Sequence, residues 1–348
     1  MAAPSRSIVF LGQDLQSPSF RYRAASLYPK LQELGWVVRQ EQLPRGRYGV
    51  RLWERRALLS SVNIAFLAQF KLSGPEAWLL RRFVPHLVFD VDDAIYVRQP
   101  RRFGDSPHDS YWRRQKFASS CRHADCVVAG NEILAGIARR NAREVVVLPT
   151  PVDPARYRAE KPDLLRPPTI VWIGRPENLV YLELLHPALA RLSTSYPNLR
   201  LRVVCSIFPP WDDVAIEAVP WSADTEVAAL ADADIGIMPL THDEWTEGKC
   251  AFKLLQYMAA SLPCVASPVG ASVGAVIDGK TGFLAATDAE WEQALLRLIR
   301  APELRQAFGA AGRRHLESHY SLDGYVQRYA ALLTRIGESP GQGPNPAA

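Results

Sequence analysis

The alternation of short apolar runs with helical patterns is the feature that most limits what this chain can fold into. Segments 7–12 (SIVFLG), 63–70 (NIAFLAQF) and 86–94 (HLVFDVDDA) have the composition of buried strands, and helical segments lie between them. Strands that alternate with helices predict a parallel sheet covered by helices, because parallel strands need long crossover connections. The series starts again at 169–175 (TIVWIGR). We therefore expect two consecutive doubly wound, Rossmann-like α/β domains.

The proline-rich stretch KPDLLRPP separates the two series and has the composition of a linker. A chain of 348 residues also fits two domains better than one. The predicted organisation is a first domain over 1–160, a linker over 161–168, a second domain over 169–320, an amphipathic helix over 321–336 that crosses back to the first domain, and a disordered tail over 337–348.

The charge is distributed unevenly between the two halves. Residues 1–160 hold 25 Lys and Arg against 15 Asp and Glu, whereas the net charge of the whole chain is only +5. A basic first half indicates an anionic partner: a charged substrate, a nucleic acid or an anionic membrane surface. Solvated arginine-rich helix faces explain the same excess equally well. No aromatic-basic platform or helix-turn-helix pattern supports nucleic acid.

Cellular location is constrained by the cysteines and by the apolar runs. The five cysteines are odd in number and scattered, as is common in a reducing compartment. No apolar run is long enough to span a bilayer, and the first residues lack a secretory pattern. We expect a cytoplasmic protein, with peripheral contact to the cytoplasmic face of an anionic membrane as a further possibility. We predict no metal site and no cofactor.

Ligands of doubly wound sheets bind at the carboxyl ends of the strands, where helix N-termini point outward. The segment GKCAFKLLQYMAAS follows a strand and a loop. It predicts a helix with Gly248, Lys249 and Cys250 in its first turn. Free N–H groups of a first turn, a glycine and a lysine together form a cradle for a diphosphate. The alternative is an ordinary helix start with a solvated lysine.

Several motifs occur in an order that resembles a known enzyme family. They are DIGIMPL, GKCAFKLLQYMAASLPCVASPVG and DGKTGFLAAT in the second half, with WIGR (172–175), AGN (129–131), LPTPVDPARY (148–157) and FDVDDA (89–94) elsewhere. This pattern resembles the retaining nucleotide-sugar glycosyltransferases of the GT-B fold, group 1 (family 4), over most of residues 7–336. The resemblance implies two Rossmann-like domains that face a cleft, a nucleotide-sugar donor in the second domain and an acceptor beside the first.

The resemblance also implies two glutamates separated by seven residues, one for the sugar hydroxyls and one for the ribose. The second position is Gln256 here, whose amide can still bond a ribose diol as donor and acceptor. Glu247 lies one residue too far from Gln256 for the pattern, which puts its sugar-directed role in doubt. Glu244 is a possible substitute.

Further donor-side residues come from the same resemblance. The loop with Gly174 and Arg175 matches the family loop in which an arginine contacts the donor diphosphate, and the planar guanidinium suits that task. The lysine that the family often has five residues later is Val180 here, so Lys249 or Lys253 would supply the missing charge. Trp221 would stack on or flank the nucleobase, with a core position as the alternative.

On the first domain the resemblance and the strand ends point to a second set of residues. Asp92 and Asp93 follow a strand and would contact the sugars or act as an acceptor-side base; a helix cap at Asp92 is the alternative. The remaining acceptor-side candidates are Gly12, Arg21 and Arg23. Asp90-x-Asp92 also has the spacing of metal-dependent glycosyltransferases of the other fold and of phosphatases that use the first aspartate as nucleophile.

These residues predict a glycosyltransferase that moves a sugar from a nucleotide diphosphate-sugar to an acceptor hydroxyl on a glycan or lipid-linked glycan precursor. Basic groups and helix amides would stabilise the leaving diphosphate in place of a metal. The resemblance implies retention without a covalent intermediate, with the departing phosphate taking the acceptor proton. The alternatives are a non-catalytic binding relative and a magnesium-dependent phosphatase that uses Asp90.

Overall fold

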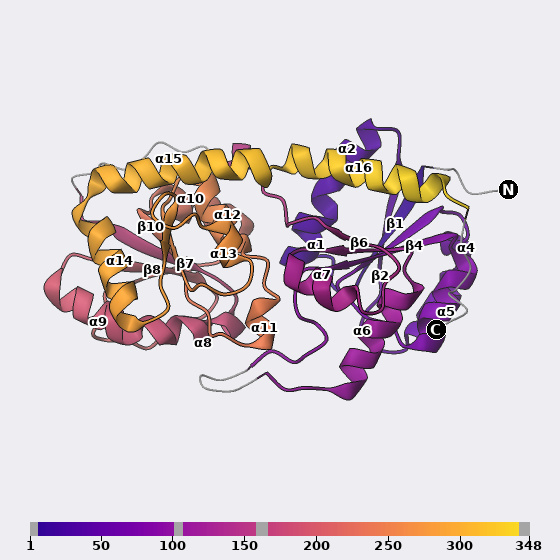
Figure 1. The fold of residues 1–348 in the computed structure, drawn as a ribbon, viewed down its shortest axis with the longest axis horizontal. Coiled ribbons are helices and arrows are strands. Elements are labelled where there is room, and N and C mark those ends of the chain that lie inside the picture. The colour runs from indigo at the N-terminus through magenta and orange to yellow at the C-terminus, as the bar shows by residue number, and fades with distance from the viewer. Residues whose placement is uncertain (1–5, 101–106, 158–165, 341–348) are drawn as a thin grey trace.

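The computed structural model describes residues 6–100, 107–157 and 166–340. It consists of two α/β domains side by side, each built on one parallel sheet (Figure 1). The predicted fold class is therefore confirmed. The predicted linker lies largely outside the described residues.

The first sheet has the strand order β2-β1-β3-β4-β5-β6, with every pair parallel. Its strands are β1 (Ser7–Gly12), β2 (Val37–Gln42), β3 (Ile64–Ala68), β4 (His86–Val91), β5 (Cys126–Ala129) and β6 (Val145–Val147). Its helices are α1 (Pro18–Arg23), α2 (Tyr28–Glu33), α3 (Tyr48–Glu54), α4 (Arg56–Leu59), α5 (Gly74–Phe83), α6 (Tyr111–His123) and α7 (Glu132–Ala138), with short 3₁₀ turns at Ala25–Leu27 and Pro154–Tyr157.

The second sheet has the order β12-β11-β10-β7-β8-β9 and is also parallel. Its strands are β7 (Thr169–Ile173), β8 (Arg200–Cys205), β9 (Ile216–Pro220), β10 (Ile235–Met238), β11 (Cys264–Ala266) and β12 (Gly282–Leu284). Its helices are α8 (Leu179–Leu182), α9 (His186–Ser195), α10 (Ala223–Ala231), α11 (Glu244–Glu247), α12 (Phe252–Ala259), α13 (Ser272–Ala275), α14 (Asp288–Arg300) and α15 (Pro302–His319), with 3₁₀ turns at Pro176–Asn178 and Glu183–Leu185.

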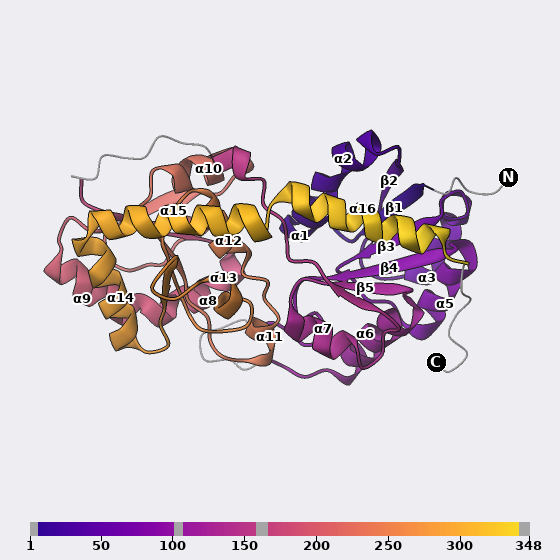
Figure 2. The ribbon, with the colours of Figure 1, turned by 45° about the horizontal axis from the view of Figure 1, so that its top comes forward.

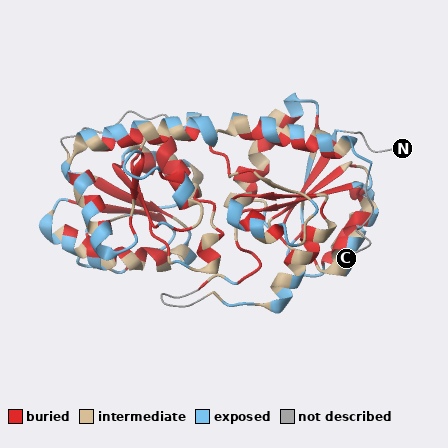
Figure 3. Ribbon diagram, viewed as in Figure 1, coloured by how far each residue is buried: buried red, intermediate tan, exposed pale blue. Residues whose placement is uncertain are grey.

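The inner strands of both sheets are buried on their two faces, whereas the edge strands β2 and β9 are partly exposed (Figure 3). Inner strands such as β1, β3 and β4 are buried at every residue, which explains why they are continuous apolar runs rather than alternating ones. Helices that carry one apolar stripe cover the sheets and expose their polar faces. This arrangement leaves the carboxyl ends of the strands and the loops after them as the places where polar side chains can gather.

Two long helices lie end to end along one side of the molecule (Figures 1 and 2). Helix α15 packs on α12 of the second domain, whereas α16 (Leu322–Glu338) returns to the first domain. There, Tyr329 and Leu333 join the core of Phe10 and Phe66. The predicted crossing helix is present and ends at Glu338, two residues beyond its predicted end. Most of the predicted tail, 341–348, lies outside the described residues.

Candidate active site

The segment from Glu244 to Ala251 differs from the predicted helix start. The Asp243 carboxylate accepts from the N–H groups of Trp245 and Thr246, both at 2.9 Å, and so caps the single turn α11. The N–H groups of Gly248 and Lys249 then donate to the carbonyls of Trp245 and Thr246. The expectation that the amides at 248–250 form a free cradle is therefore wrong, because the capped turn uses two of them.

Helix α12 begins four residues later than predicted, at Phe252, after Ala251 adopts a left-handed φ of 54°. Its first N–H groups have no acceptor within the helix, as at any helix start. Lys253 lies in this first turn. Lys253, rather than Lys249, is therefore the lysine at the start of the helix.

Gly248 lies where the two domains touch. A Cβ on Gly248 would come within 2.7 Å of the Ala94 Cβ and 2.9 Å of the Ala94 nitrogen. The Asn131 amide donates to the carbonyls of Gly248 and Lys249, both at 3.1 Å. Gly248 is thus required by the close approach of the domains, and Asn131 fixes the segment that carries Lys249.

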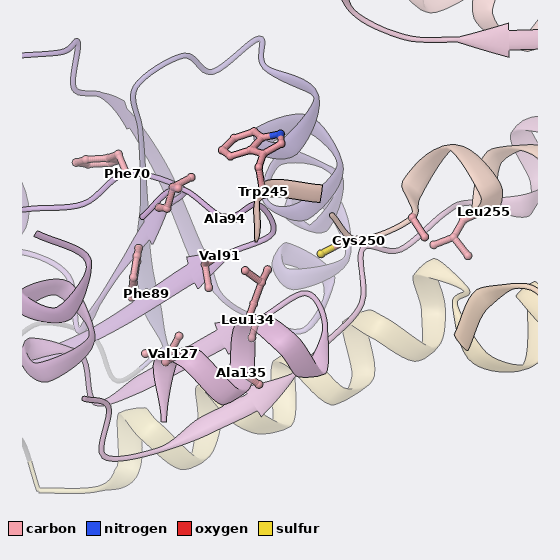
Figure 4. Close-up of a cluster of buried hydrophobic side chains, with 14 of the residues drawn as sticks. Phe70, Phe89, Val91, Ala94, Val127, Leu134, Ala135, Trp245, Cys250 and Leu255 are labelled. Atoms are coloured by element: carbon pink, nitrogen blue, oxygen red, sulfur yellow. The ribbon is translucent and has the colours of Figure 1, made fainter. Parts of the chain in front are cut away.

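Cys250 also serves this junction. Its thiol donates to the Asp92 carbonyl at 3.1 Å, and a Cβ on Gly130 would overlap its sulfur. Figure 4 shows Trp245 and Cys250 from the second domain in one buried cluster with Ala94 of the first. The cores of the two domains are therefore continuous beside the candidate site, and Cys250 acts there through its side chain.

Lys253 is held over the loop that contains Gly174. Its Nζ lies 4.4 Å from the centre of the Trp172 ring, and a Cβ on Gly174 would come within 3.0 Å of that nitrogen and would overlap the ring. Within the described chain, no carboxylate pairs with Lys253. Burial, and then the neighbouring charge of Lys249, lower the pKa of Lys253 to about 7. A half-buried ammonium without a counter-ion is suited to bind an anion.

Lys249 and Arg175 lie close enough to Asp93 for their charges to act on it across the junction. The Lys249 ammonium lies 3.5 Å from Asn178 Oδ1, and Arg175 is exposed and pairs with Glu177 at 3.3 Å. Burial raises the pKa of Asp93, and the charges of Lys249 and then Arg175 oppose this shift. The structure thus brings together three residues that the sequence assigned to catalysis, with Asp93 coming from the first domain and the two cations from the second.

The other aspartates of the FDVDDA segment lie deeper. Arg23 donates to both carboxylate oxygens of Asp90, to the Leu148 carbonyl at 2.9 Å and to the Thr150 hydroxyl at 3.2 Å. Arg23 and Asp90 are each 1% exposed. This pair is structural, so the expectation that Arg23 contacts a ligand and the alternative of an Asp90 nucleophile are both wrong.

Asp92 is buried, and no helix follows it for its side chain to cap, since residues 94–97 form a turn. The helix-cap alternative is therefore wrong. Burial raises the pKa of Asp92 well above its usual range, and Arg23 opposes the shift only partly. Its Oδ1 has no hydrogen-bond partner in the described part of the chain, as suits a carboxyl group that keeps its proton.

Gln256 belongs to a network that the sequence did not reveal. Its Nε2 donates to Glu226 Oε1 at 2.5 Å and to the Tyr157 hydroxyl at 3.2 Å. Glu226 also accepts from the Tyr22 hydroxyl at 2.8 Å and from Trp221 Nε1 at 2.9 Å. Trp221 is 40% exposed, so its alternative as a core residue is wrong. The network joins the first-domain Tyr22 to the second domain.

The two candidate glutamates have different partners. Glu244 accepts two bonds from Arg114 of the first domain, at 2.9 and 2.8 Å, and is thereby held in a contact between domains. Among the described residues, the one ion pair of Glu247 is with the exposed His242, at 3.3 Å. Of the two carboxylates, Glu247 is the one left for a ligand.

The two remaining acceptor-side residues serve packing and stacking. A Cβ on Gly12 would lie 2.6 Å from the Phe20 ring, so the glycine is required by the packing of α1 on β1. The Arg21 guanidinium lies over the rings of Tyr22 and Trp221, at 5.4 and 5.8 Å. Arg21 therefore lies beside the Glu226 network.

The described residues contain neither a cluster of metal ligands nor a membrane-spanning helix. Across the described ranges, the side chains of His, Cys, Asp and Glu form no group of three or more that could hold a metal ion. In the same ranges, every helix is too short or too polar to cross a bilayer.

Comparison with known proteins then connects this geometry to a family. Residues 167–301 match the model of a family described as "Glycosyl transferases group 1". This segment contains Gly174, Glu226 and Gln256, together with Lys249 and Lys253. The second domain of this chain is thus similar to group 1 glycosyltransferases. No curated protein sequence is significantly similar to the chain.

Solved structures of glycosyltransferases share the fold over nearly the whole chain. Sucrose-phosphate synthase from Thermosynechococcus elongatus matches with a TM-score of 0.73 at 13% identity, covering 95% of this chain and 99% of that one. A glycosyltransferase from Rickettsia africae matches with 0.71 at 12% identity, covering 96% and 99%. HepE from Anabaena, in complex with UDP-glucose, matches with 0.68 at 12% identity, covering 95% and 100%. The fold is GT-B.

Three residues of this candidate site were missed by sequence reasoning. Glu226 belongs to an ordinary amphipathic helix, Asn131 lies in the other domain from the segment it holds, and Asn178 ends a short 3₁₀ turn. Each acts through a partner that is distant in the chain. The one usable signal was the AGN motif, which contains Asn131.

Proposed function

We propose that this protein is a glycosyltransferase that transfers a sugar from a nucleotide diphosphate-sugar to an acceptor hydroxyl, with retention of the anomeric configuration. The observation that carries the proposal is that the charges of Lys249 and Arg175 act on Asp93 across the junction, beside Lys253, which pairs with no carboxylate among the described residues. Cations and a carboxylate from opposite domains suit a reaction whose donor is anionic and whose acceptor is a hydroxyl.

The donor diphosphate would bind Lys253, Lys249 and Arg175. Lys253 has no carboxylate partner to displace within the described residues, whereas Arg175 would exchange its weak, exposed pair with Glu177 for a phosphate. HepE, of the same fold, was crystallised with UDP-glucose. The nucleoside would extend towards Gln256 and Trp221, where Gln256 is already oriented by Glu226.

In the reaction, the bond between the anomeric carbon and the diphosphate oxygen breaks, and its electron pair stays on the phosphate. The three cations stabilise that growing charge electrostatically, without a metal ion in this proposal. The acceptor oxygen forms the new bond on the face that the diphosphate leaves, and its proton passes to the departing phosphate. Asp93 orients the acceptor hydroxyl, and Glu247 accepts hydrogen bonds from the hydroxyls of the donor sugar.

Release of free nucleoside diphosphate tests this proposal. Purified protein would be incubated with a panel of nucleotide sugars and glycan acceptors, with and without EDTA, and the anomeric configuration of any product read by NMR. We expect diphosphate release that EDTA does not abolish, and an axial donor giving an axial product. An inverted product, or release that requires added Mg²⁺, would contradict the mechanism.

The acceptor is a glycan or a lipid-linked precursor in this proposal. The basic first domain favours an anionic acceptor, and contact with an anionic membrane surface would present such a lipid. Salt-dependent binding to anionic vesicles is the expected result for the lipid-linked case.

A further inference from the structure

Four cations gather at the carboxyl edge of the first sheet, outside the donor site. Arg45 follows β2, Lys71 follows β3, and Arg113 and Lys116 lie in the first turns of α6. We call Arg45, Lys71, Arg113 and Lys116 the first-domain basic cluster. Their charges act on one another: Arg113, Arg45 and Lys116 all influence Lys71, and Arg45 influences Arg113.

The cluster lacks a counter-ion. Among the described residues, no carboxylate forms an ion pair with any of its members. Arg45 Nε donates to the Gln13 side chain at 3.3 Å, and Arg113 Nε donates to the Ile95 carbonyl at 3.2 Å. Burial, and then the three neighbouring cations, lower the pKa of Lys71 to about 7. Among the described residues, the charges that act on Lys71 are those of Arg113, Arg45 and Lys116, so the four cations repel one another.

Other buried cations of the same domain are neutralised. Arg23 pairs with Asp90, and Arg81 pairs with Asp125 at 2.7 Å. Half-buried positive charge without compensation is costly and is therefore kept where it serves a ligand. Gln69, two residues before Lys71, supports this reading: its φ is 61°, and its buried Nε2 has no acceptor in the described chain.

The cluster lies on the acceptor side of the candidate site. Arg113 is bonded to the carbonyl of Ile95, two residues beyond Asp93 on the same loop after β4. An acceptor whose hydroxyl is held at Asp93 would therefore extend over this edge of the sheet. We propose that the first-domain basic cluster binds a phosphate group carried by the acceptor. This inference rests on the proposed function, because it assumes that Asp93 addresses the acceptor.

The test measures binding of inorganic phosphate while saturating UDP fills the donor site. Calorimetry on the full chain would compare the parent with Lys71→Met, Arg113→Met and Arg45→Met, and with Lys280→Met as a control, since Lys280 is an exposed cation of the second domain. We expect each cluster variant to weaken phosphate binding about tenfold and the control to leave it unchanged. Parent-like phosphate affinity in all three cluster variants would overturn the proposal.

Two further readouts separate this inference from its alternatives. UDP affinity should be the same in all variants; a parent protein that binds no UDP contradicts the proposed function, whereas loss of the phosphate effect alone contradicts only this inference. Without phosphate, Lys71→Met should unfold at a temperature no lower than the parent, because it removes an uncompensated charge; a marked fall would instead indicate a structural lysine. Arg45 is exposed, so its variant should fold in either case.

The phosphate can come from a soluble sugar phosphate or from a lipid headgroup, and two probes distinguish these sources. Glucose 6-phosphate would be tested by competition with inorganic phosphate, and vesicles of phosphatidylcholine with and without phosphatidic acid by flotation. Competition by glucose 6-phosphate alone supports a soluble acceptor. Flotation that requires phosphatidic acid and is lost in Lys71→Met supports a lipid acceptor. Failure of both probes to bind would overturn the proposal.

Discussion

Arg23 and Lys253 are both largely removed from water, one in each domain, but their surroundings differ completely. Arg23 donates to a carboxylate, a carbonyl and a hydroxyl. Lys253 rests on the Trp172 ring beside a second lysine and has no carboxylate partner in the described residues. A buried charge that is fully compensated stabilises a fold, whereas one left uncompensated is available for a ligand. The difference separates a structural ion pair in the first domain from a cation in the second domain that we propose binds the donor.

The largest expected effect concerns the compensated charge. Arg23→Met should lower the free energy of unfolding by about 3–5 kcal/mol, because it leaves the Asp90 carboxylate buried without a partner. Denaturant unfolding measures this effect. The double variant Arg23→Met with Asp90→Leu should recover much of the loss. If Arg23→Met unfolded like the parent but lost UDP binding, Arg23 would be a ligand-binding residue rather than a structural one.

Replacing the uncompensated Lys253 should lower activity and leave stability unchanged, the opposite of the effect expected at Arg23. Lys253→Met should lower kcat/KM about a hundredfold, through the loss of charge-assisted bonds to the diphosphate. The unfolding temperature should not fall, because the ammonium is already poorly solvated. Lys280→Met serves as the control for a lost positive charge. Normal activity in Lys253→Met would remove Lys253 from the site.

The two domains approach each other closely at Gly248. Gly248→Ala would place a Cβ 2.7 Å from that of Ala94, a strain that costs about 1–3 kcal/mol and pushes the domains apart. Small-angle scattering should report a larger radius of gyration, and activity should fall. Gly274→Ala, whose Cβ would meet nothing within 4 Å, is the matched control. A compact, fully active Gly248→Ala protein would show that the junction tolerates the added atom.

The smallest expected effect is a pH dependence. The pKa of Lys253 is lowered to about 7 by burial and by Lys249, so the ammonium is charged below that pH and neutral above it. A diphosphate prefers the charged form, so the affinity for UDP-glucose should fall as pH rises through this value, by up to about tenfold per pH unit. Calorimetry between pH 6 and pH 9 measures it. Lys253→Met should flatten the profile, and an unchanged slope in that variant would assign the titration to another group.

The fold was accessible from sequence because it depends on local patterns. Runs such as 7–12 and 169–175 are strands where the alternation predicts them, and the last helix crosses back to the first domain. These features follow from apolar periodicity within short windows. The sequence therefore predicted the fold class.

The site was accessible only in part because it depends on tertiary contacts. Sequence reasoning put Gly248 in the first turn of a helix. In the structure, Asp243 caps the short helix α11, which ends before Gly248, and the left-handed Ala251 precedes α12. It offered Arg23 as a ligand contact, because nothing local shows that Asp90 lies opposite it. Glu226 was missed since its partners come from three distant segments. Local patterns place residues at an edge, and only packing decides which of them are neutralised.

A crystal structure with bound UDP would show which cations hold the diphosphate. We predict a phosphate oxygen within hydrogen-bond distance of Lys253 Nζ, about 3 Å, with Lys249 and Arg175 turned towards the same group and Arg23 still paired with Asp90. A diphosphate seated away from Lys253, or one held by a cation at Asp90 and Asp92, would contradict this prediction.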